Sequence, residues 1–300
     1  MPDANPRVLV VGAGPAGLTC ASHLAKMDVA VDLAEQGQAV GGAVRQYEHA
    51  EIWVPIPGLT ANSLVAGFRQ EARQARLTLL LGRRVTSIQV REDCILADDQ
   101  PYAAVVLATG APPRGLEHAG EGVIVAPGRA LESVDVRGLR VAVCGGGDNA
   151  FENAARMRRE GAACVDVFSR GDLRARPQLI REALDLGARI AVGPYRIEGR
   201  RIVRAQDPRN DDQFDIVAVL WGFAPRLPKI EAPGLTAGAP LKGRHPLPRL
   251  WVIGDALPDE ERSILAAMGD GSRVAKAVEA FLHSDQCWTE KALSLGAVDA

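Results

Sequence analysis

The sequence predicts an α/β protein built from two parallel-sheet domains, each organised around a strand–turn–helix unit. Two glycine-rich turns carry this prediction: Gly12–Gly17, which follows the apolar run Val8–Val11, and Gly145–Ala150, which follows Val141–Cys144. An apolar run that ends at such a turn and continues into a helical pattern is typical of a buried parallel strand. The 300 residues suffice for two domains of ordinary size.

The first unit begins close to the N-terminus. A strand is expected at Arg7–Val11, a helix at Pro15–Met27 and a second parallel strand at Val29–Glu35, which completes a βαβ unit. A helix at Ala61–Gln74 follows a loop rich in proline and glycine. Further apolar segments predict strands at Leu77–Leu81, Val85–Val90, Cys94–Ala97 and Ala103–Thr109.

The second unit begins at Arg140, after the turn-rich residues Ala111–Arg114, which mark a crossing between domains. Its helix is expected at Asn149–Glu160 and its second strand at Cys164–Phe168. The remaining predicted elements are a helix at Pro177–Leu186, a strand at Arg189–Val192, a hairpin through Glu198-Gly199, a strand at Asp215–Trp221, a return linker at Pro225–Pro233, a strand at Leu250–Ile253 and a helix at Arg262–Leu282.

Composition and charge argue against several classes of protein. The net charge of −2 gives no basis for binding nucleic acid or an anionic membrane, and no apolar run approaches the ~20 residues that span a bilayer. The five cysteines, Cys20, Cys94, Cys144, Cys164 and Cys287, are scattered, with no C-x-x-C pair and no metal-ligand spacing. This pattern favours reduced thiols in a cytoplasmic protein, and the polar N-terminus shows no secretory signal.

The first turn has the residues of a dinucleotide-binding site. In such a turn the first glycine allows the tight bend, the second lets a pyrophosphate approach the backbone, and the third permits close packing of helix on strand. The helix N-terminus adds free N–H groups and the positive end of the helix dipole. Glu35 stands about 20 residues after Gly12, where its carboxylate can accept hydrogen bonds from ribose hydroxyls.

The second turn ends in Ala150, a permitted variant of the third glycine, and is followed by basic residues. Its next strand leads into Ser169-Arg170, with Arg174 and Arg176 close behind. Because guanidinium groups favour a 2′-phosphate, these residues predict a preference for NADP(H), with NAD(H) still possible. The alternative is a solvated basic loop. Two such turns indicate Rossmann-like domains and an enzyme that passes electrons between two nucleotides.

Several motifs occur in a distinctive order: Gly12–Gly17, Ala108-Thr109-Gly110, Gly145–Ala150, Ser169–Ala175, Gly222-Phe223-Ala224-Pro225, Gly254-Asp255 and Arg262-Ser263-Ile264. This order resembles the flavoproteins with two dinucleotide-binding domains, and within them the low-molecular-weight thioredoxin reductases. The resemblance implies an NAD(P)H-binding domain at residues 114–227. That domain would be inserted into an FAD-binding domain formed by residues 1–113 and 228–300, with a C-terminal tail at 284–300.

The resemblance also implies two sets of cofactor-binding residues. Asp255 would bind the ribityl chain of FAD, and the helix that begins near Arg262 would point its positive end at the flavin pyrimidine. The glutamine that the family places after Gly41-Gly42 is replaced here by Ala43. The FAD set is Gly12, Gly14, Pro15, Ala16, Gly17, Glu35, Gly42, Trp53, Thr109, Gly110, Gly254, Asp255, Ser263 and Ile264. The NAD(P)H set is Gly145, Gly147, Asp148, Asn149, Ala150, Ser169, Arg170 and Arg174, with Ser169 in place of one arginine of the family.

The redox dithiol of thioredoxin reductases is missing from its place before the second turn, where the chain reads Ala130–Asp135. Without it, electrons cannot pass from flavin to a protein disulfide by that route. The chain therefore resembles more closely the thioredoxin-reductase-type ferredoxin–NADP reductases, which implies a homodimer that delivers electrons to ferredoxin. No catalytic side chain is expected, because hydride transfer depends on alignment of the two cofactors.

Two other functions stay open, and so does the role of the aromatic residues. The flavin could serve oxidation or reduction of a small molecule, including thiols or specialised metabolites, or the chain could be a non-catalytic redox sensor that binds nucleotides. Tyr47 and Trp53 could stack on the flavin or cover the edge of the domain, and Trp288 in the tail could cap a flavin or pack on the surface.

Overall fold

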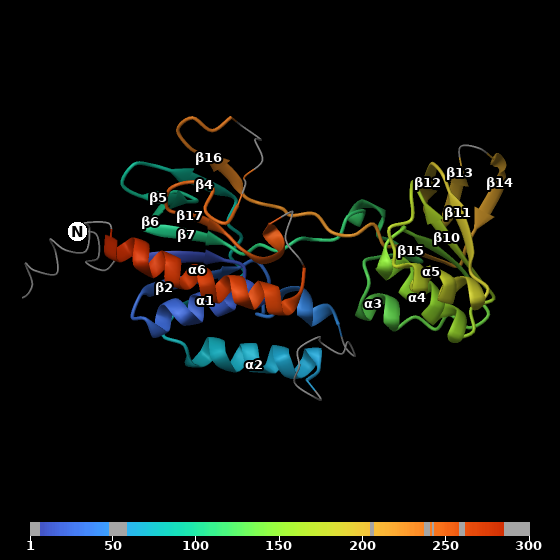
Figure 1. Ribbon diagram of the computed structural model, residues 1–300, viewed down its shortest axis with the longest axis horizontal. Coiled ribbons are helices and arrows are strands. Elements are labelled where there is room, and N and C mark those ends of the chain that lie inside the picture. The colour runs from blue at the N-terminus through green and yellow to red at the C-terminus, as the bar shows by residue number, and fades with distance from the viewer. Residues whose placement is uncertain are drawn as a thin grey trace, which may run out of the picture. The chain divides into compact units, whose positions relative to one another are not determined.

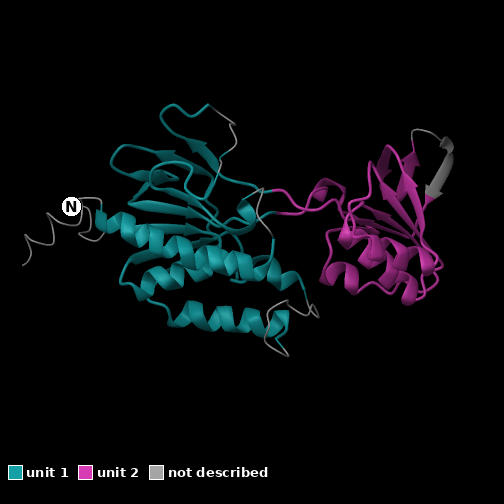
Figure 2. Ribbon diagram, in the orientation of Figure 1, with its two compact units in different colours: residues 1–111, 225–300 teal, residues 112–224 magenta. Residues whose placement is uncertain are grey.

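The computed structural model describes residues 7–47, 59–204, 207–236, 241, 243–257 and 262–284. The chain divides into two compact units, one formed by residues 1–111 and 225–300 and the other by residues 112–224 (Figure 2). Both crossings lie a few residues before the positions expected from the sequence. At the crossings, residues 112–114 hydrogen-bond to residues 222–224: the Arg114 N–H donates to the Gly222 carbonyl, and the Ala224 N–H donates to the Pro112 carbonyl.

A parallel sheet forms the centre of the first unit (Figure 1); its strands are, in order across the sheet, β17 (Leu250–Val252), β7 (Ala104–Leu107), β1 (Arg7–Val11), β2 (Ala30–Glu35) and β3 (Thr78–Leu81). Because β1 pairs with both β2 and β7, the glycine-rich turn that follows β1 opens at the middle of the carboxyl edge. Open α/β sheets bind their ligands at this edge.

Helices cover one face of this sheet and a smaller sheet covers the other. The helices are α1 (Pro15–Lys26), α2 (Ala61–Gln74) and α6 (Ile264–Ser284). Leu18 and Leu24 of α1 are buried with Val274 and Val278 of α6, so these two helices share one core. The smaller sheet has the order β16 (Lys229–Glu231), β4 (Ser87–Val90), β5 (Ile95–Ala97) and β6 (Gln100–Tyr102).

The second unit repeats this arrangement. Its parallel sheet has the order β11 (Arg189–Val192), β10 (Cys164–Ser169), β9 (Arg140–Cys144), β15 (Ile216–Val219) and β8 (Val123–Val125). Helices α3 (Arg129–Glu132), α4 (Asp148–Arg159) and α5 (Pro177–Asp185) supply the core on one face, where Phe151 and Met157 are fully buried. On the other face, an antiparallel sheet of β12 (Tyr195–Glu198), β13 (Arg201–Arg204) and β14 (Asp207–Gln213) packs through Tyr195 and Ile202 against Phe168.

This architecture confirms the predicted α/β fold class, and most predicted helices and strands begin and end within a few residues of the observed ones. The elements that were not predicted are β6, β8, β14, β16, α3 and the 3-10 helices η1 (Gly42–Gln46), η2 (Leu116–His118) and η3 (Gly254–Ala256). Most are too short to show a periodic pattern, and β14 is polar and contains proline. Within the described residues, no helix is both long and apolar enough to cross a membrane.

Candidate dinucleotide sites

The first glycine-rich turn joins β1 to α1 and leaves no room for side chains at its two ends. Gly12 has a φ of +104°, and a Cβ there would lie 2.3 Å from the carbonyl oxygen of Ala108. A Cβ at Gly17 would lie 1.8 Å from the carbonyl oxygen of Gly12. The fold itself therefore requires the first and third glycines, because the turn touches the end of β7 and α1 begins directly on the turn.

The middle of the turn is less crowded. The nearest atom to a Cβ at Gly14 would be the Cα of Gly42, at 3.8 Å. Gly42 has a φ of +54° and would place its own Cβ 2.8 Å from the Cα of Gly14, so the loop after β2 meets the turn backbone to backbone. Pro15 occupies the first position of α1 and Ala16 is buried. The N–H groups of this first helical turn have no acceptor within the helix and are available to an anion.

Glu35, the last residue of β2, joins the turn to the next loop. Its Oε2 accepts a hydrogen bond from the Ala13 N–H at 2.9 Å, and its Oε1 accepts one from the Gly37 N–H at 2.7 Å. A carboxylate offers about four acceptor positions, so each oxygen keeps a lone pair for a further donor. The geometry therefore leaves Glu35 able to accept hydrogen bonds from ribose hydroxyls while it holds the turn.

Thr109 and Gly110 extend the same edge from the end of β7. The Thr109 hydroxyl oxygen is buried and makes no hydrogen bond with the described residues. Gly110 has a φ of +68°. Buried hydroxyl groups almost always have a partner in folded proteins. An unsatisfied one beside the glycine-rich turn is the feature expected where a polar ligand completes the site.

The turn after β17 lies against the start of α1. A Cβ at Gly254 would lie 2.9 Å from the Cβ of Ala16, which requires glycine at this position. The next residue, Asp255, is partly buried, and burial raises the pKa of its carboxyl group while the nearby Arg262 opposes this shift. Asp255 therefore lies at the carboxyl edge, close to the first turn.

A buried carboxylate that the sequence prediction missed holds the turn at Gly254 in place. Asp270, on α6, is only 5% exposed. It accepts hydrogen bonds from the Gly254 N–H at 3.3 Å, from Arg244 Nε at 2.9 Å and from Arg273 Nη1 at 3.1 Å. The available signal was an acid between two glycines, Gly269-Asp270-Gly271, inside a predicted helix.

The start of α6 meets the loop after β2. The helix begins at Ile264, and the Ser263 hydroxyl oxygen accepts a hydrogen bond from the Ala266 N–H at 3.1 Å. Ile264 and Tyr47 pack against a small buried cluster that includes Val44. The structure thus brings Gly42, Tyr47, Ser263 and Ile264 to one region of the unit. Trp53 and Trp288 lie outside the described residues.

The second glycine-rich turn joins β9 to α4 and differs from the first in its free space. A Cβ at Gly145 would lie 2.4 Å from the carbonyl oxygen of Leu220, and one at Gly146 would lie 2.4 Å from the Ser169 hydroxyl oxygen. At Gly147, no described atom lies within 4 Å of where a Cβ would be. Ala150 is fully buried in the core beneath α4. Among the three glycines of this turn, Gly147 at the helix N-cap is therefore the one with open space for a side chain.

The loop after β10 folds back onto this turn. The N–H groups of Arg174 and Ala175 both donate to the carbonyl oxygen of Gly146, at 2.7 and 3.0 Å. Ser169 is 4% exposed, and its hydroxyl donates to the carbonyl oxygen of Gly171 at 2.8 Å. Ser169 therefore shapes the loop from within, while the exposed side chain of Arg174 stands beside the turn.

Not all the arginines of this loop are equally available. Arg176 Nε donates to Asp148 Oδ2 at 2.8 Å, and Arg176 Nη2 donates to Glu152 Oε1 at 3.1 Å, so the first turns of α4 neutralise its charge. The Arg170 guanidinium lies over the Trp221 ring, 3.8 Å from its centroid. Asn149, also on α4, is exposed, and its carbonyl accepts a hydrogen bond from Asn153.

The described cysteines, Cys20, Cys94, Cys144 and Cys164, are all unpaired. Burial raises the pKa of both the Cys20 and the Cys144 thiols to about 12. A thiol with so high a pKa carries almost no thiolate near neutral pH and is a poor nucleophile. Cys144, although it directly precedes the second turn, is thus a core residue.

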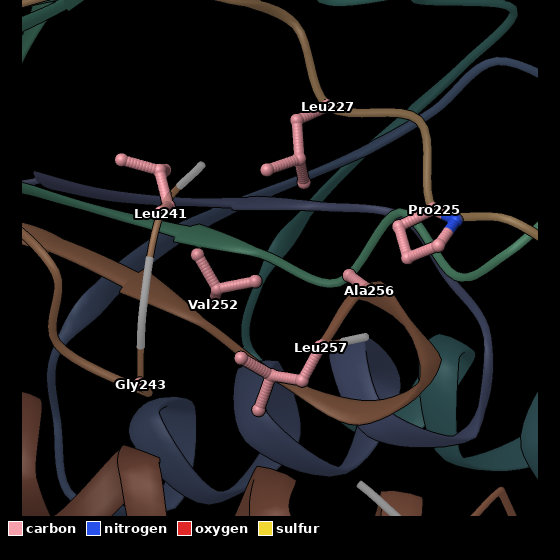
Figure 3. A pocket seen from close by; sticks show the side chains of 7 residues that line it. All are labelled: Pro225, Leu227, Leu241, Gly243, Val252, Ala256 and Leu257. Atoms are coloured by element: carbon pink, nitrogen blue, oxygen red, sulfur yellow. The ribbon is translucent and has the colours of Figure 1, made fainter. Parts of the chain in front are cut away.

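The first unit also contains an apolar cavity of about 360 Å³ (Figure 3). It lies beside the residues that follow Asp255 and is lined by Pro225, Leu227, Leu241, Gly243, Val252, Ala256 and Leu257. These residues present no charged or hydrogen-bonding side chain. The described residues that line it therefore offer no side chain that would bind the phosphates of a dinucleotide.

Comparison with known proteins gives a family and a fold. Residues 6–271 match the family described as pyridine nucleotide-disulphide oxidoreductase. The chain is 27% identical to a ferredoxin–NADP reductase of Granulibacter bethesdensis, over 93% of this chain and 90% of that protein. It is 31% identical to the ferredoxin–NAD(+) reductase component of the anthranilate 1,2-dioxygenase system of Burkholderia cepacia, over 70% of this chain and 63% of that protein. Its fold is that of the thioredoxin reductase of Lactococcus lactis, with a TM-score of 0.71 and 23% identity over 93% of this chain and all of that one.

Proposed function

The chain belongs to the pyridine nucleotide-disulphide oxidoreductase family, and from that premise we propose that it oxidises NADPH and delivers the electrons to ferredoxin. It is an FAD-dependent NAD(P)H oxidoreductase. The observation that carries the proposal is the pair of strand–turn–helix units, each at the carboxyl edge of its own parallel sheet. Bound FAD accepts hydride from a nicotinamide and can release electrons one at a time.

The residues at the first turn fit FAD. Glu35 has lone pairs that can accept hydrogen bonds from ribose hydroxyls. The buried Thr109 hydroxyl makes no hydrogen bond with the described residues, and a bound ligand would supply its partner. The α1 N-terminus directs N–H groups at the place where Gly12–Gly17 admits a pyrophosphate. Asp255, partly buried at the same edge, would bind the ribityl chain, and Ser263 and Ile264 would place the α6 N-terminus toward the flavin.

The residues at the second turn fit a nicotinamide dinucleotide, and two arginines favour NADPH. The open space at Gly147 lies at the N-terminus of α4, where a pyrophosphate would sit. Arg174 and Arg170 would bind the 2′-phosphate, with Ser169 shaping their loop. Arg176 is already paired with Asp148 and Glu152, which leaves it little to offer.

Ferredoxin is the proposed acceptor for two reasons. Relatives that extend over nine-tenths of the chain are named ferredoxin–NADP reductases. In addition, the sequence contains five cysteines but no C-x-x-C motif. A dithiol of that kind is therefore not available to reduce a protein disulfide. The same proposal includes a homodimer and a cytoplasmic location. Light scattering of the FAD-loaded protein measures its oligomeric state.

The test is NADPH-driven reduction of cytochrome c by the FAD-loaded protein, with and without a [2Fe–2S] ferredoxin. Ferredoxin should raise the rate about tenfold or more. At NADPH concentrations near the wild-type Kd, Gly147→Ala should remove most of this increase, because the variant binds the nucleotide more weakly. A parallel assay offers thioredoxin and low-molecular-weight disulfides as acceptors. A rate that ferredoxin leaves unchanged, or efficient reduction of a disulfide, would contradict the proposed acceptor.

A further inference from the structure

At the second turn, the side chain of Arg170 makes a contact that its proposed role does not explain. Its guanidinium lies 3.8 Å from the centroid of the Trp221 ring and 5.2 Å from that of Tyr195. Arg170 directly follows β10, whereas Trp221 stands just after β15. We call Arg170, Trp221 and Tyr195 together the arginine clasp.

The clasp spans the strand that carries the turn. In the sheet, β9 lies between β10 and β15 and pairs with both. Neighbouring strands are about 4.8 Å apart, so an arginine that follows β10 reaches Trp221 only by extending across the end of β9. The guanidinium is therefore held against the Trp221 ring, beside the end of β15.

The Trp221 ring is itself fixed on several sides. Its Nε1 donates to the Tyr195 hydroxyl oxygen at 2.8 Å, and the His118 ring meets it edge-on with 5.2 Å between centroids. Gly115, with a φ of +85°, lies so close that a Cβ there would be 2.8 Å from the ring carbon Cε3. Because the ring cannot follow Arg170, any movement of the guanidinium toward the loop breaks the stacked contact.

We propose that Trp221 sets nucleotide selectivity by competing with the 2′-phosphate for the Arg170 guanidinium. This inference rests on the proposed use of NADP(H). A nucleotide without the 2′-phosphate leaves Arg170 stacked on Trp221, so this contact does not affect its affinity. A nucleotide with the 2′-phosphate engages Arg170 only after the stack opens, which weakens its apparent affinity about two- to five-fold for an exposed cation–π contact.

The test compares binding of 2′,5′-ADP and 5′-AMP to the FAD-loaded full chain by calorimetry, which requires no turnover. Trp221→Leu should tighten 2′,5′-ADP about two- to five-fold and leave 5′-AMP unchanged. In the Arg170→Ala background, which should bind 2′,5′-ADP more weakly than wild type, the same change should have no effect on either probe. A Trp221→Leu protein that binds 2′,5′-ADP no more tightly than wild type would overturn the inference.

A measurement on the unmodified protein keeps the test independent of how the variants fold. The ring current of Trp221 should shift the NMR signals of the Arg170 side chain. These signals are assigned by their absence from the spectrum of Arg170→Ala. Saturating 2′,5′-ADP should remove this displacement, and 5′-AMP should leave it. A displacement that persists with 2′,5′-ADP bound refutes the competition while leaving an NADP(H) preference through Arg174 intact. Equal affinity of the wild type for the two probes would contradict that preference as well.

Discussion

Gly147→Ala should separate binding of the nicotinamide dinucleotide from folding, because Gly147 is the one glycine of the second turn with open space for a side chain. Its φ of −102° and ψ of −179° suit any residue, and no described atom lies within 4 Å of the added Cβ. Replacing glycine by alanine at an N-cap costs about 0.5 kcal/mol, and reduced freedom of the unfolded chain returns about 0.4–1 kcal/mol. The free energy of unfolding should therefore change by less than about 0.5 kcal/mol.

Nucleotide binding should respond very differently. A methyl group at the N-cap of α4 occupies the space through which a pyrophosphate approaches the helix N–H groups. Loss of one charge-assisted hydrogen bond is worth about 1.5–3 kcal/mol, so the Kd for NADPH should rise about 10- to 150-fold. Calorimetric titration gives the Kd and thermal denaturation gives the stability of the same preparation.

Two other glycine substitutions provide the controls. Gly67→Ala adds a methyl group in open space on α2 and should leave the Kd for NADPH unchanged. Gly17→Ala should destabilise the first unit, because its Cβ would lie 1.8 Å from a carbonyl oxygen. If Gly147→Ala binds NADPH as tightly as the wild type, the second turn is not where the pyrophosphate binds.

Three further predictions concern single groups. Glu35→Gln should weaken FAD binding about 10- to 100-fold, because the NH₂ of the new amide would face the N–H of Ala13 or Gly37. The increase in flavin fluorescence as FAD dissociates measures this loss. Glu71→Gln, which removes an exposed ion pair, is the control and should bind FAD like the wild type. Arg174→Ala should raise the Kd for NADPH about tenfold and leave that for NADH unchanged, so an equal loss for both nucleotides would refute a contact with the 2′-phosphate. Cys20 and Cys144, whose pKa values burial raises from 9.0 to about 12, should resist alkylation at pH 9 until the protein unfolds. Because the unfolded thiols lose protons that the folded ones keep, the free energy of unfolding should fall as the pH rises from about 9 to about 12, and a stability that increases over this range would contradict the burial.

The parts of the site that could be predicted are those encoded by neighbouring residues. A strand, a glycine-rich turn, a helix and an acid at the end of the next strand form one continuous pattern, so the sequence predicts that Glu35 lies beside the first turn. The structure places its carboxylate 2.9 Å from the Ala13 nitrogen. The same pattern predicts that Ser169 and Arg174 lie beside the second turn, because they belong to the strand and loop that follow it in the sequence. The Arg174 N–H donates a hydrogen bond to the carbonyl oxygen of Gly146.

The parts that could not be predicted depend on contacts between distant segments. Asp270 acts on Gly254 only because α6 packs on α1, where a Cβ at Gly271 would lie 2.3 Å from the carbonyl oxygen of Ala16. The sequence identifies a group of arginines after β10, but not which of them have partners. Arg176 is paired with Asp148 and Arg170 is stacked on Trp221, so the number of arginines overstates the charge available to a phosphate.

The central claim is that one chain binds FAD at the first turn and NADPH at the second, and passes electrons from the second nucleotide to the first. Anaerobic titration of the FAD-loaded protein with NADPH, followed by flavin absorbance, tests it most directly. One equivalent of NADPH per flavin should bleach the flavin completely, and NADH should require a higher concentration. A flavin that stays oxidised in excess NADPH would contradict the account.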